Sequence, residues 1–193
     1  MKVIGESGVE SLSLREVARR LGVSHQAPYK HFASRDHILA EVIRRAFADF
    51  AEYLEARPRS EDPDQDMANM GRAYLQYARE HPLHYQLMFE TRKPDPAAHP
   101  TMMAQAQYAF ALLSNGLRRL PFRDPADPAD LDALFIWSCL HGLASILKGQ
   151  GLERLAMPAQ MVEHAEPFVL GRIGRALGRP EQAAPGGSGR RRH

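Results

Sequence analysis

A chain of 193 residues with a formal net charge of +2 is long enough for one or two domains with a sizeable core, and 44% hydrophobic with 25% charged residues is an ordinary globular composition. No apolar run approaches the length of a membrane span, and the N-terminus MKVIGESG is too short and polar for a signal peptide. We therefore expect a cytoplasmic protein with no membrane partner. The single cysteine, Cys139, excludes an intramolecular disulfide.

The stretch from Ser11 to Phe47 predicts a helix-turn-helix. Ser13 and Glu16 form an S-x-x-E capping box at the start of a first helix, and apolar residues then follow at helical spacing as far as Gly22. Glycine can end a helix in the left-handed conformation without steric cost. After this turn, a serine at position 24 is suited to cap a second helix.

The second helix, residues 25–32, presents polar side chains that suit contact with DNA. Its exposed positions carry His25, Gln26, Tyr29, Lys30 and His31. These side chains can donate hydrogen bonds to base edges near the helix start and to phosphates beyond it. Ser34 then caps a third helix, whose apolar residues can bury the back of the pair. Residues 1–47 carry eight Lys or Arg against five Asp or Glu, a modest basic excess for a DNA-binding head.

Prolines and capping residues divide the rest of the chain into further helices. The first expected helix runs from Arg35 to about Arg57, a second begins at Pro63, and a short third covers Pro82 to Phe89. A fourth contains Met103 to Leu117, and the last two cover 128–149 and 158–177. The helix at 128–149 is apolar on nearly all sides, which predicts burial on more than one face. No strand pattern is found, so the predicted fold is all-α, with residues 1–47 and 48–178 as two domains and a disordered tail at 179–193.

The string LREVARRLGVSHQAPYKHF resembles the TetR family of bacterial transcriptional regulators, and Trp137, His141 and Gly142 resemble the W-x-x-x-H-G segment of one TetR subgroup. The resemblance implies a DNA-binding head followed by a helical ligand-binding and dimerisation domain. In such a head a full helix precedes the position of Gly8, whereas here only 2–7 remain. Two alternatives follow: a start site assigned too late, or a naturally shortened first helix.

The resemblance also implies roles for individual residues of the head. Ser24, Tyr29 and His31 would meet phosphates, Lys30 would do so or reach a base, and His25, Gln26 and Ala27 would approach base edges. Gln26 is the strongest candidate for a base contact, because its amide can pair bidentately with adenine. Ser13 and Arg35, at neighbouring helix starts, are expected to hold phosphates.

Methionine and aromatic residues in the second domain predict a pocket for a small, mostly apolar effector, because methionines adapt to varied apolar shapes. The same residues at helical spacing are also typical of a plain core. The predicted ligand-binding residues are Met70, Tyr74, Met88, Phe89, Met103, Phe110, Trp137 and His141. His141 either anchors a polar ligand group or bonds a neighbouring carbonyl, and the second alternative is preferred. His81 and His84 lack supporting ligands at a metal-binding spacing, so neither a metal nor a cofactor is expected.

The function predicted is that of a homodimeric, sequence-specific DNA-binding repressor, which binds a pseudo-palindromic double-stranded operator and is released by its effector. The resemblance implies that 128–149 and 158–177 form a four-helix dimer interface, and their apolar surplus agrees. An alternative is a helical interaction protein that has lost DNA binding through a shortened N-terminus. Enzymatic function is not expected, since neither a Gly-rich phosphate loop nor a G-x-S-x-G motif is found.

Overall fold

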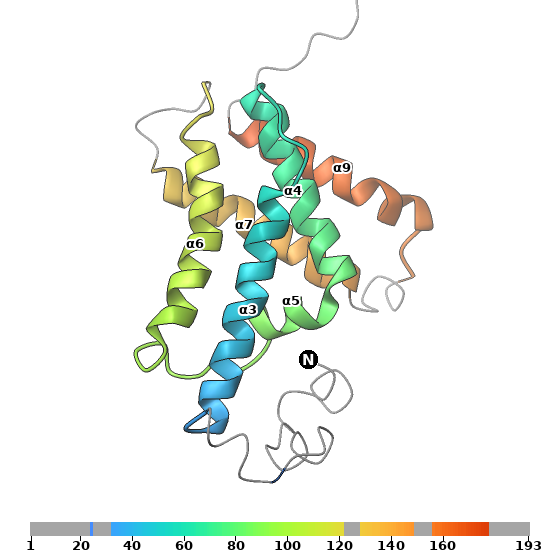
Figure 1. The fold of residues 1–193 in the computed structure, drawn as a ribbon. Coiled ribbons are helices and arrows are strands. Elements are labelled where there is room, and N and C mark those ends of the chain that lie inside the picture. Colours follow the sequence, from blue (N-terminus) through green and yellow to red (C-terminus); the bar gives the residue numbers. More distant parts are fainter. Residues whose placement is uncertain (1–23, 25–31, 122–127, 149–155, 178–193) are drawn as a thin grey trace, which may run out of the picture.

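The computed structural model describes residues 24, 32–121, 128–148 and 156–177. Within these ranges every regular element is an α-helix, which confirms the all-α expectation (Figure 1). The helices are α3 (Arg35–Glu55), α4 (Pro63–Glu80), α5 (Pro82–Phe89), α6 (Pro100–Leu117), α7 (Ala129–Lys148) and α9 (Ala159–Ala176). Apart from residues 24 and 32–47, the DNA-binding head proposed from the sequence lies outside the described residues, as does the tail at 179–193.

Helix α3 begins as the sequence predicts and ends two residues earlier than expected. The Ser34 hydroxyl accepts a hydrogen bond from the backbone N–H of His37 at 3.3 Å, which is the predicted N-cap. The helix ends at Glu55 rather than at Arg57. Arg57 precedes Pro58, and a residue before proline is disfavoured in the helical region because the proline ring crowds it. The predicted cap is therefore confirmed, and the predicted end is corrected by this local steric effect.

Proline opens three consecutive helices of the second domain. Pro63, Pro82 and Pro100 stand in the first turns of α4, α5 and α6, where the missing N–H would have no partner in the helix. The side chain of Asp62 accepts from the N–H of Asp64 at 3.0 Å and so caps α4. His81 ends α4 and begins α5, so the chain turns without an intervening loop. The starts at Pro63 and Pro82 agree with those read from the sequence, whereas Pro100, which was expected in the preceding loop, opens α6.

The described helices enclose one large apolar core. Helix α3 lies alongside α6 and packs against α4 and α5, while α7 crosses behind them and contacts α4, α6 and α9 (Figure 1). The largest fully buried side chains come from α3, α4, α5 and α6: Ile43, Leu75, Tyr77, Tyr85, Leu87, Met88, Met102 and Leu117. Helices α4 and α9 approach closely at Gly71, where an added Cβ would lie 2.6 Å from a methyl group of Leu170. Helix α3, which begins within the predicted head, is thus packed directly into the second domain.

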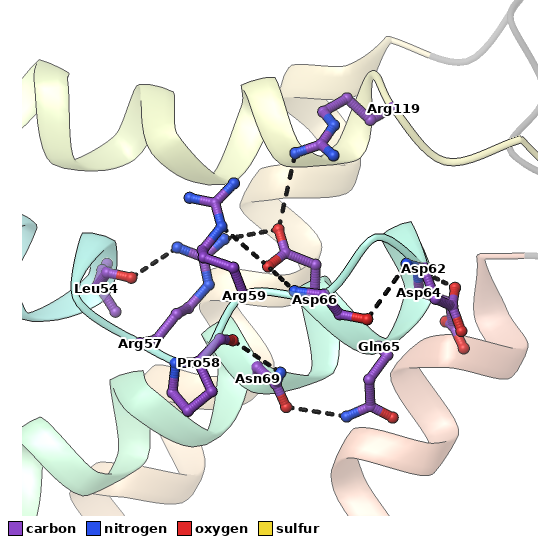
Figure 2. Close-up of polar contacts among 11 residues, drawn as sticks. Leu54, Arg57, Pro58, Arg59, Asp62, Asp64, Gln65, Asp66, Asn69 and Arg119 are labelled. Carbon is purple, nitrogen blue, oxygen red and sulfur yellow. Dashed lines mark hydrogen bonds and ion pairs between the residues drawn. The ribbon is translucent and has the colours of Figure 1, made fainter.

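A buried ion pair joins the end of α3 to the start of α4. Arg57 donates to the carboxylate of Asp66 at 2.9 Å and to the carbonyl of Leu54 at 2.6 Å (Figure 2). Arg59 and Arg119, at 3.2 and 3.8 Å, approach the same carboxylate from the outside. Burial lowers the pKa of the Arg57 guanidinium, and the nearby Asp66 carboxylate opposes that effect. The carboxylate therefore holds the α3–α4 connection and the end of α6 together.

Helix α7 carries more apolar side chains than a single chain buries. Among the described residues it is the one helix whose length and composition would allow it to span a membrane, with a mean hydropathy of 1.3, which corrects the expectation that no run approached such a length. A core helix passes the same test, and α7 packs against three other helices of the domain. Large apolar side chains nevertheless remain exposed on α7 and α9: Leu131, Leu134, Phe135, Ile146, Met161, Val162 and Phe168.

Candidate functional site

The helical domain contains a cavity of about 580 Å³, within the range of small-molecule binding sites. Residues from α3, α4, α5, α6, α7 and α9 form its wall. All eight ligand-binding candidates named from the sequence lie on that wall: Met70, Tyr74, Met88, Phe89, Met103, Phe110, Trp137 and His141. The tertiary structure therefore brings together in one site residues that are widely spread along the chain.

Most of the cavity wall is apolar and adaptable. Five methionines from three helices line it: Met67, Met70, Met88, Met102 and Met103. Helix α3 contributes Ile43, Phe47, Phe50 and Leu54, and α9 contributes Leu170 and Ile173. The contributions of α3 and α9 were missed by the sequence reasoning, because these residues read as ordinary core positions of their own helices. Long thioether side chains can change rotamer around ligands of different shape, so the wall suits a mostly apolar molecule.

Two polar residues of the wall, Tyr74 and His141, are hydrogen-bonded in a cluster with the fully buried Tyr85. The Tyr85 hydroxyl lies 2.6 Å from Nδ1 of His141, and the Tyr74 hydroxyl lies 3.1 Å from that of Tyr85 and 3.4 Å from the same nitrogen. The partners of His141 are therefore phenols, which corrects the preferred expectation of a carbonyl. Burial raises the pKa of both tyrosines and lowers the pKa of His141, so all three groups are neutral near pH 7.

The single tryptophan of the chain lies beside this cluster. Trp137 and His141 are four residues apart on α7 and so share one face, with ring centroids 6.0 Å apart. The indole also contacts Phe89 and Phe110, at centroid distances of 5.9 and 6.2 Å. The W-x-x-x-H spacing thus places an aromatic surface and an imidazole side by side on the cavity wall. Its fluorescence makes Trp137 a natural reporter of occupancy.

Two charged residues on the cavity wall were not foreseen from the sequence. Lys93 follows α5, and burial lowers the pKa of its ammonium although much of the side chain is exposed, which places it at the cavity edge. Asp64 lies in the first turn of α4. Glu90, close to Lys93 in sequence, is paired with Lys148 at 2.7 Å. Nothing in the local pattern marked Lys93, since its loop is rich in charged residues and proline.

The histidines at positions 81 and 84 serve the packing of α4 and α5. Their rings stack at a centroid distance of 5.7 Å, and the Tyr77 hydroxyl lies 2.9 Å from Nδ1 of His84. Asp49 of α3 stands 3.7 Å from the same nitrogen. Burial lowers the pKa of His84. Within the part of the chain that the structure describes, no cluster of three or more His, Cys, Asp or Glu side chains could hold a metal ion.

Only two of the predicted DNA-binding residues fall within the described ranges. Ser24 is exposed, and Arg35 is half-buried in the first turn of α3, where the sequence placed it at a helix start. The other seven lie outside the described residues: Ser13, His25, Gln26, Ala27, Tyr29, Lys30 and His31. Their contacts with DNA, and those of Ser24 and Arg35, remain predictions.

Comparison with family models identifies both parts of the chain. Residues 1–42 match the model of "Bacterial regulatory proteins, tetR family", and residues 67–166 match "Tetracyclin repressor-like, C-terminal domain". The regulator TcmR of Streptomyces glaucescens is 30% identical over 112 residues, which are 58% of this chain and 46% of TcmR. The chain thus spans about half the length of the curated relatives it matches.

Solved structures share the architecture over most of their length. A protein of unknown function from Rhodococcus sp. RHA1 is 26% identical with a TM-score of 0.77, and the match covers 91% of this chain and 89% of that one. The TetR family regulator PfmR of Thermus thermophilus has a TM-score of 0.63 over 94% and 96% of the two chains, and at 20% identity it shares the fold alone. Because the C-terminal family model covers more than half of the chain and the N-terminal model covers the predicted helix-turn-helix, this protein belongs to the TetR family of bacterial transcriptional regulators.

Proposed function

We propose that this protein is a cytoplasmic, homodimeric repressor that binds a pseudo-palindromic operator and is released by a small, mostly apolar effector held in the cavity. The observation that carries the proposal is the position of α3. Its first turn, at Arg35, follows the predicted recognition helix within the matched DNA-binding stretch, while Ile43, Phe47 and Phe50 on the same helix line the cavity. One helix therefore belongs to the head and to the effector site.

Release follows from a difference in affinity between two arrangements of the dimer. A ligand shifts an equilibrium only as far as it prefers one state over the other. An effector packed against Phe47 and Phe50 favours the position of α3 that best fits it, and the head moves with α3. When this position no longer sets the two heads one DNA turn apart, operator affinity falls.

Dimerisation is supported by the apolar surface left on α7 and α9. Phe168 is 59% exposed and Leu131 is 62% exposed. A monomeric protein rarely exposes several large apolar side chains on two adjacent helices. The two helices contact each other, which supports a single interface that takes in the exposed side chains of both. Pairing of these two helices with their copies would bury the surplus in a four-helix arrangement and set the distance between two heads.

Binding to DNA from the upstream region of its own gene is the test of the regulatory function. We would titrate labelled duplex by fluorescence anisotropy at low and moderate salt, with a scrambled duplex in parallel. Saturable binding that prefers the native duplex and weakens as salt rises is the expected result. The double variant Tyr29→Phe/Lys30→Ala should weaken binding, whereas Arg92→Ala, a charge change in the second domain, should not.

The same titration separates the regulator from the alternative of a helical interaction protein. An interaction protein would bind both duplexes equally or not at all, and the double variant would leave that behaviour unchanged. Binding to the native duplex that is insensitive to salt would also count against the proposal, because contacts to phosphates release counterions.

A further inference from the structure

The cavity wall carries polar groups at two separate places along α4. The Tyr74–Tyr85–His141 cluster lies beside the C-terminal half of α4, whereas Asp64 lies in the first turn of that helix. Ten residues separate Tyr74 from Asp64, which corresponds to roughly 15 Å along a helix axis. Methionine and phenylalanine side chains form most of the remaining wall. The cavity therefore has a largely apolar body between two polar places, the cluster with His141 and the Asp64 carboxylate.

The charge beside the cluster with His141 is positive. Lys93 lines the cavity. Burial is the main cause that lowers the pKa of His141; the Glu90 carboxylate opposes it, and the Lys148 and Lys93 ammonium groups add to it. Within the described part of the chain, no carboxylate pairs with Lys93. The nearest glutamate in sequence, Glu90, is already engaged by Lys148 through contacts of 2.7 and 2.8 Å. An ammonium left without a counter-ion at the edge of an apolar cavity favours an anion there.

The hydrogen-bond cluster directs its protons toward the same place. In the tautomer of the neutral imidazole that leaves Nδ1 unprotonated, Tyr85 donates to Nδ1 of His141 across 2.6 Å, and Tyr74 can donate to the Tyr85 oxygen across 3.1 Å. With Nδ1 accepting, the proton of the ring sits on Nε2. The hydrogen bonds that His141 makes within the described residues all use Nδ1, and His141 lines the cavity, so in this tautomer its Nε2–H is available to a ligand. His141 and Lys93 both offer donors, which selects an acceptor.

Resting on the proposed effector function, we propose that the cavity takes an anionic amphiphile, a carboxylic acid with an apolar body, whose carboxylate is bound by Lys93 and His141. The body then lies along the methionine and phenylalanine wall toward the start of α4. Tyr74 and Tyr85 are positioning residues, because they fix the His141 tautomer without touching the head group. The hydroxyl of the neutral alcohol of the same chain length can also accept a hydrogen bond, but it carries no charge to complement Lys93, and a cationic amine meets Lys93 with like charge.

A matched ligand series tests this inference. Decanoate, decanol and decylamine, each below its micelle concentration, would be titrated into the full-length protein, with Trp137 fluorescence and calorimetry as readouts. We expect decanoate to bind on the order of tenfold more tightly than decanol, because one charge-assisted hydrogen bond contributes a free energy of about that size. Decylamine should bind most weakly. The pair 4-phenylbutyrate and 4-phenylbutanol repeats the comparison with an aromatic body, and the acid should again be preferred.

Variants locate the head-group site. Lys93→Gln should remove the preference for decanoate while leaving decanol affinity unchanged, and Lys93→Arg should retain the preference. Arg92→Gln removes a positive charge from the neighbouring position, which does not line the cavity, and should change neither affinity. Equal binding of acid and alcohol to the native protein, or equal weakening of both by Lys93→Gln, overturns the inference.

Failure of the inference can be told from failure of the proposed function. The neutral apolar dye N-phenyl-1-naphthylamine reports cavity occupancy without a charged head group. If the dye and decanol bind but decanoate is not preferred, the effector site stands and the anionic ligand class is wrong. If neither the dye nor any member of the series binds, the effector function is wrong, and the inference falls with it.

Discussion

The guanidinium of Arg57 lies 2.9 Å from the carboxylate of Asp66, and both side chains are only 3% exposed. Asp66→Asn keeps the shape but leaves Arg57 buried without its counter-charge. Breaking one half of a buried ion pair costs about 3–5 kcal/mol. We expect a loss of that order in the free energy of unfolding, measured by urea denaturation.

Asp130→Asn is the matched control for Asp66. Asp130 pairs with Arg118 at 3.3 Å, but the two side chains are 67% and 53% exposed. An exposed pair contributes less than about 1 kcal/mol, so this variant should denature almost as the native protein does. Losses of similar size in the two variants would show that the Asp66 carboxylate does not hold the α3–α4 connection.

The two tyrosines hydrogen-bonded near His141 should differ in their contribution to stability. Tyr85→Phe removes the 2.6 Å hydrogen bond to His141 and leaves Nδ1 short of its main partner, so we expect a loss of about 1–2 kcal/mol. Tyr74→Phe removes only contacts of 3.1 and 3.4 Å, and Tyr85 still serves His141. Its cost should be smaller, about 0.5 kcal/mol. Thermal or urea denaturation measures both, and the reverse order would contradict the assigned directions of donation.

Filling the cavity should block the effector without unfolding the protein. Ala106 lies on α6 at the cavity wall, and Ala106→Trp places an indole in the space that a ligand needs. Binding of N-phenyl-1-naphthylamine should be lost and operator binding retained. Ala104→Trp, at an exposed position of the same helix, is the control and should bind the dye as the native protein does. Dye binding that survives Ala106→Trp would place the ligand elsewhere.

Charge on the exposed face of α7 and α9 should prevent dimerisation. Phe168 and Leu134 are 59% and 47% exposed, so glutamate at both positions can be solvated in a single chain. In the dimer the same charges would be buried and unpaired, at a cost of several kcal/mol. Light scattering after size exclusion should then give monomer mass with helical content unchanged. Ala104→Glu on α6 should leave the dimer intact, and a native protein that is itself monomeric would refute the proposed interface.

Acid should remove a small stabilisation from α3. Arg44 and Arg45, one turn along the helix, hold the pKa of Glu41 at about 2, below its ordinary value of 4.5. A depressed pKa in the folded state stabilises the protein above pH 4.5, and this contribution is lost as pH falls from 4.5 toward 2. The pairs are partly solvated, so the effect should be no more than about 1 kcal/mol. Glu41→Gln should therefore destabilise the protein at about pH 6 and hardly at about pH 2.5 in urea titrations.

Local signals in the sequence were sufficient for the helices of the second domain. A proline in the first turn has no N–H to satisfy and carries a fixed φ, so Pro63 and Pro82 marked helix starts without tertiary information. Pro100 opens α6 in the same way but was assigned to the preceding loop. Capping by Ser34 and Asp62 is equally local, because each side chain bonds an N–H two or three residues away. The end of α3 was placed two residues too far, although the restraint from Pro58 was already present in the sequence.

The cavity was predicted by residue type and could be assembled only in three dimensions. Methionine and aromatic composition named its eight candidate residues, but the same composition describes a plain core, and only packing of six helices around an unfilled space separates the two. The partners of His141 are 56 and 67 positions away in sequence, so its bond to phenols rather than a carbonyl could not be read locally.

By itself the sequence determined the helical elements, the family and the residues suited to DNA and to an apolar ligand, because caps, helical periodicity and motif spacing act over a few residues. Tertiary structure decided the chemistry of the effector site. In the sequence Lys93 belongs to an ordinary charged loop, whereas in the fold it lies at the edge of the cavity. Glu90 does not neutralise it, because Glu90 is paired with Lys148, 58 residues away in the sequence. Which charge is neutralised and which is left for a ligand depends on distances between segments that the linear order of residues does not contain.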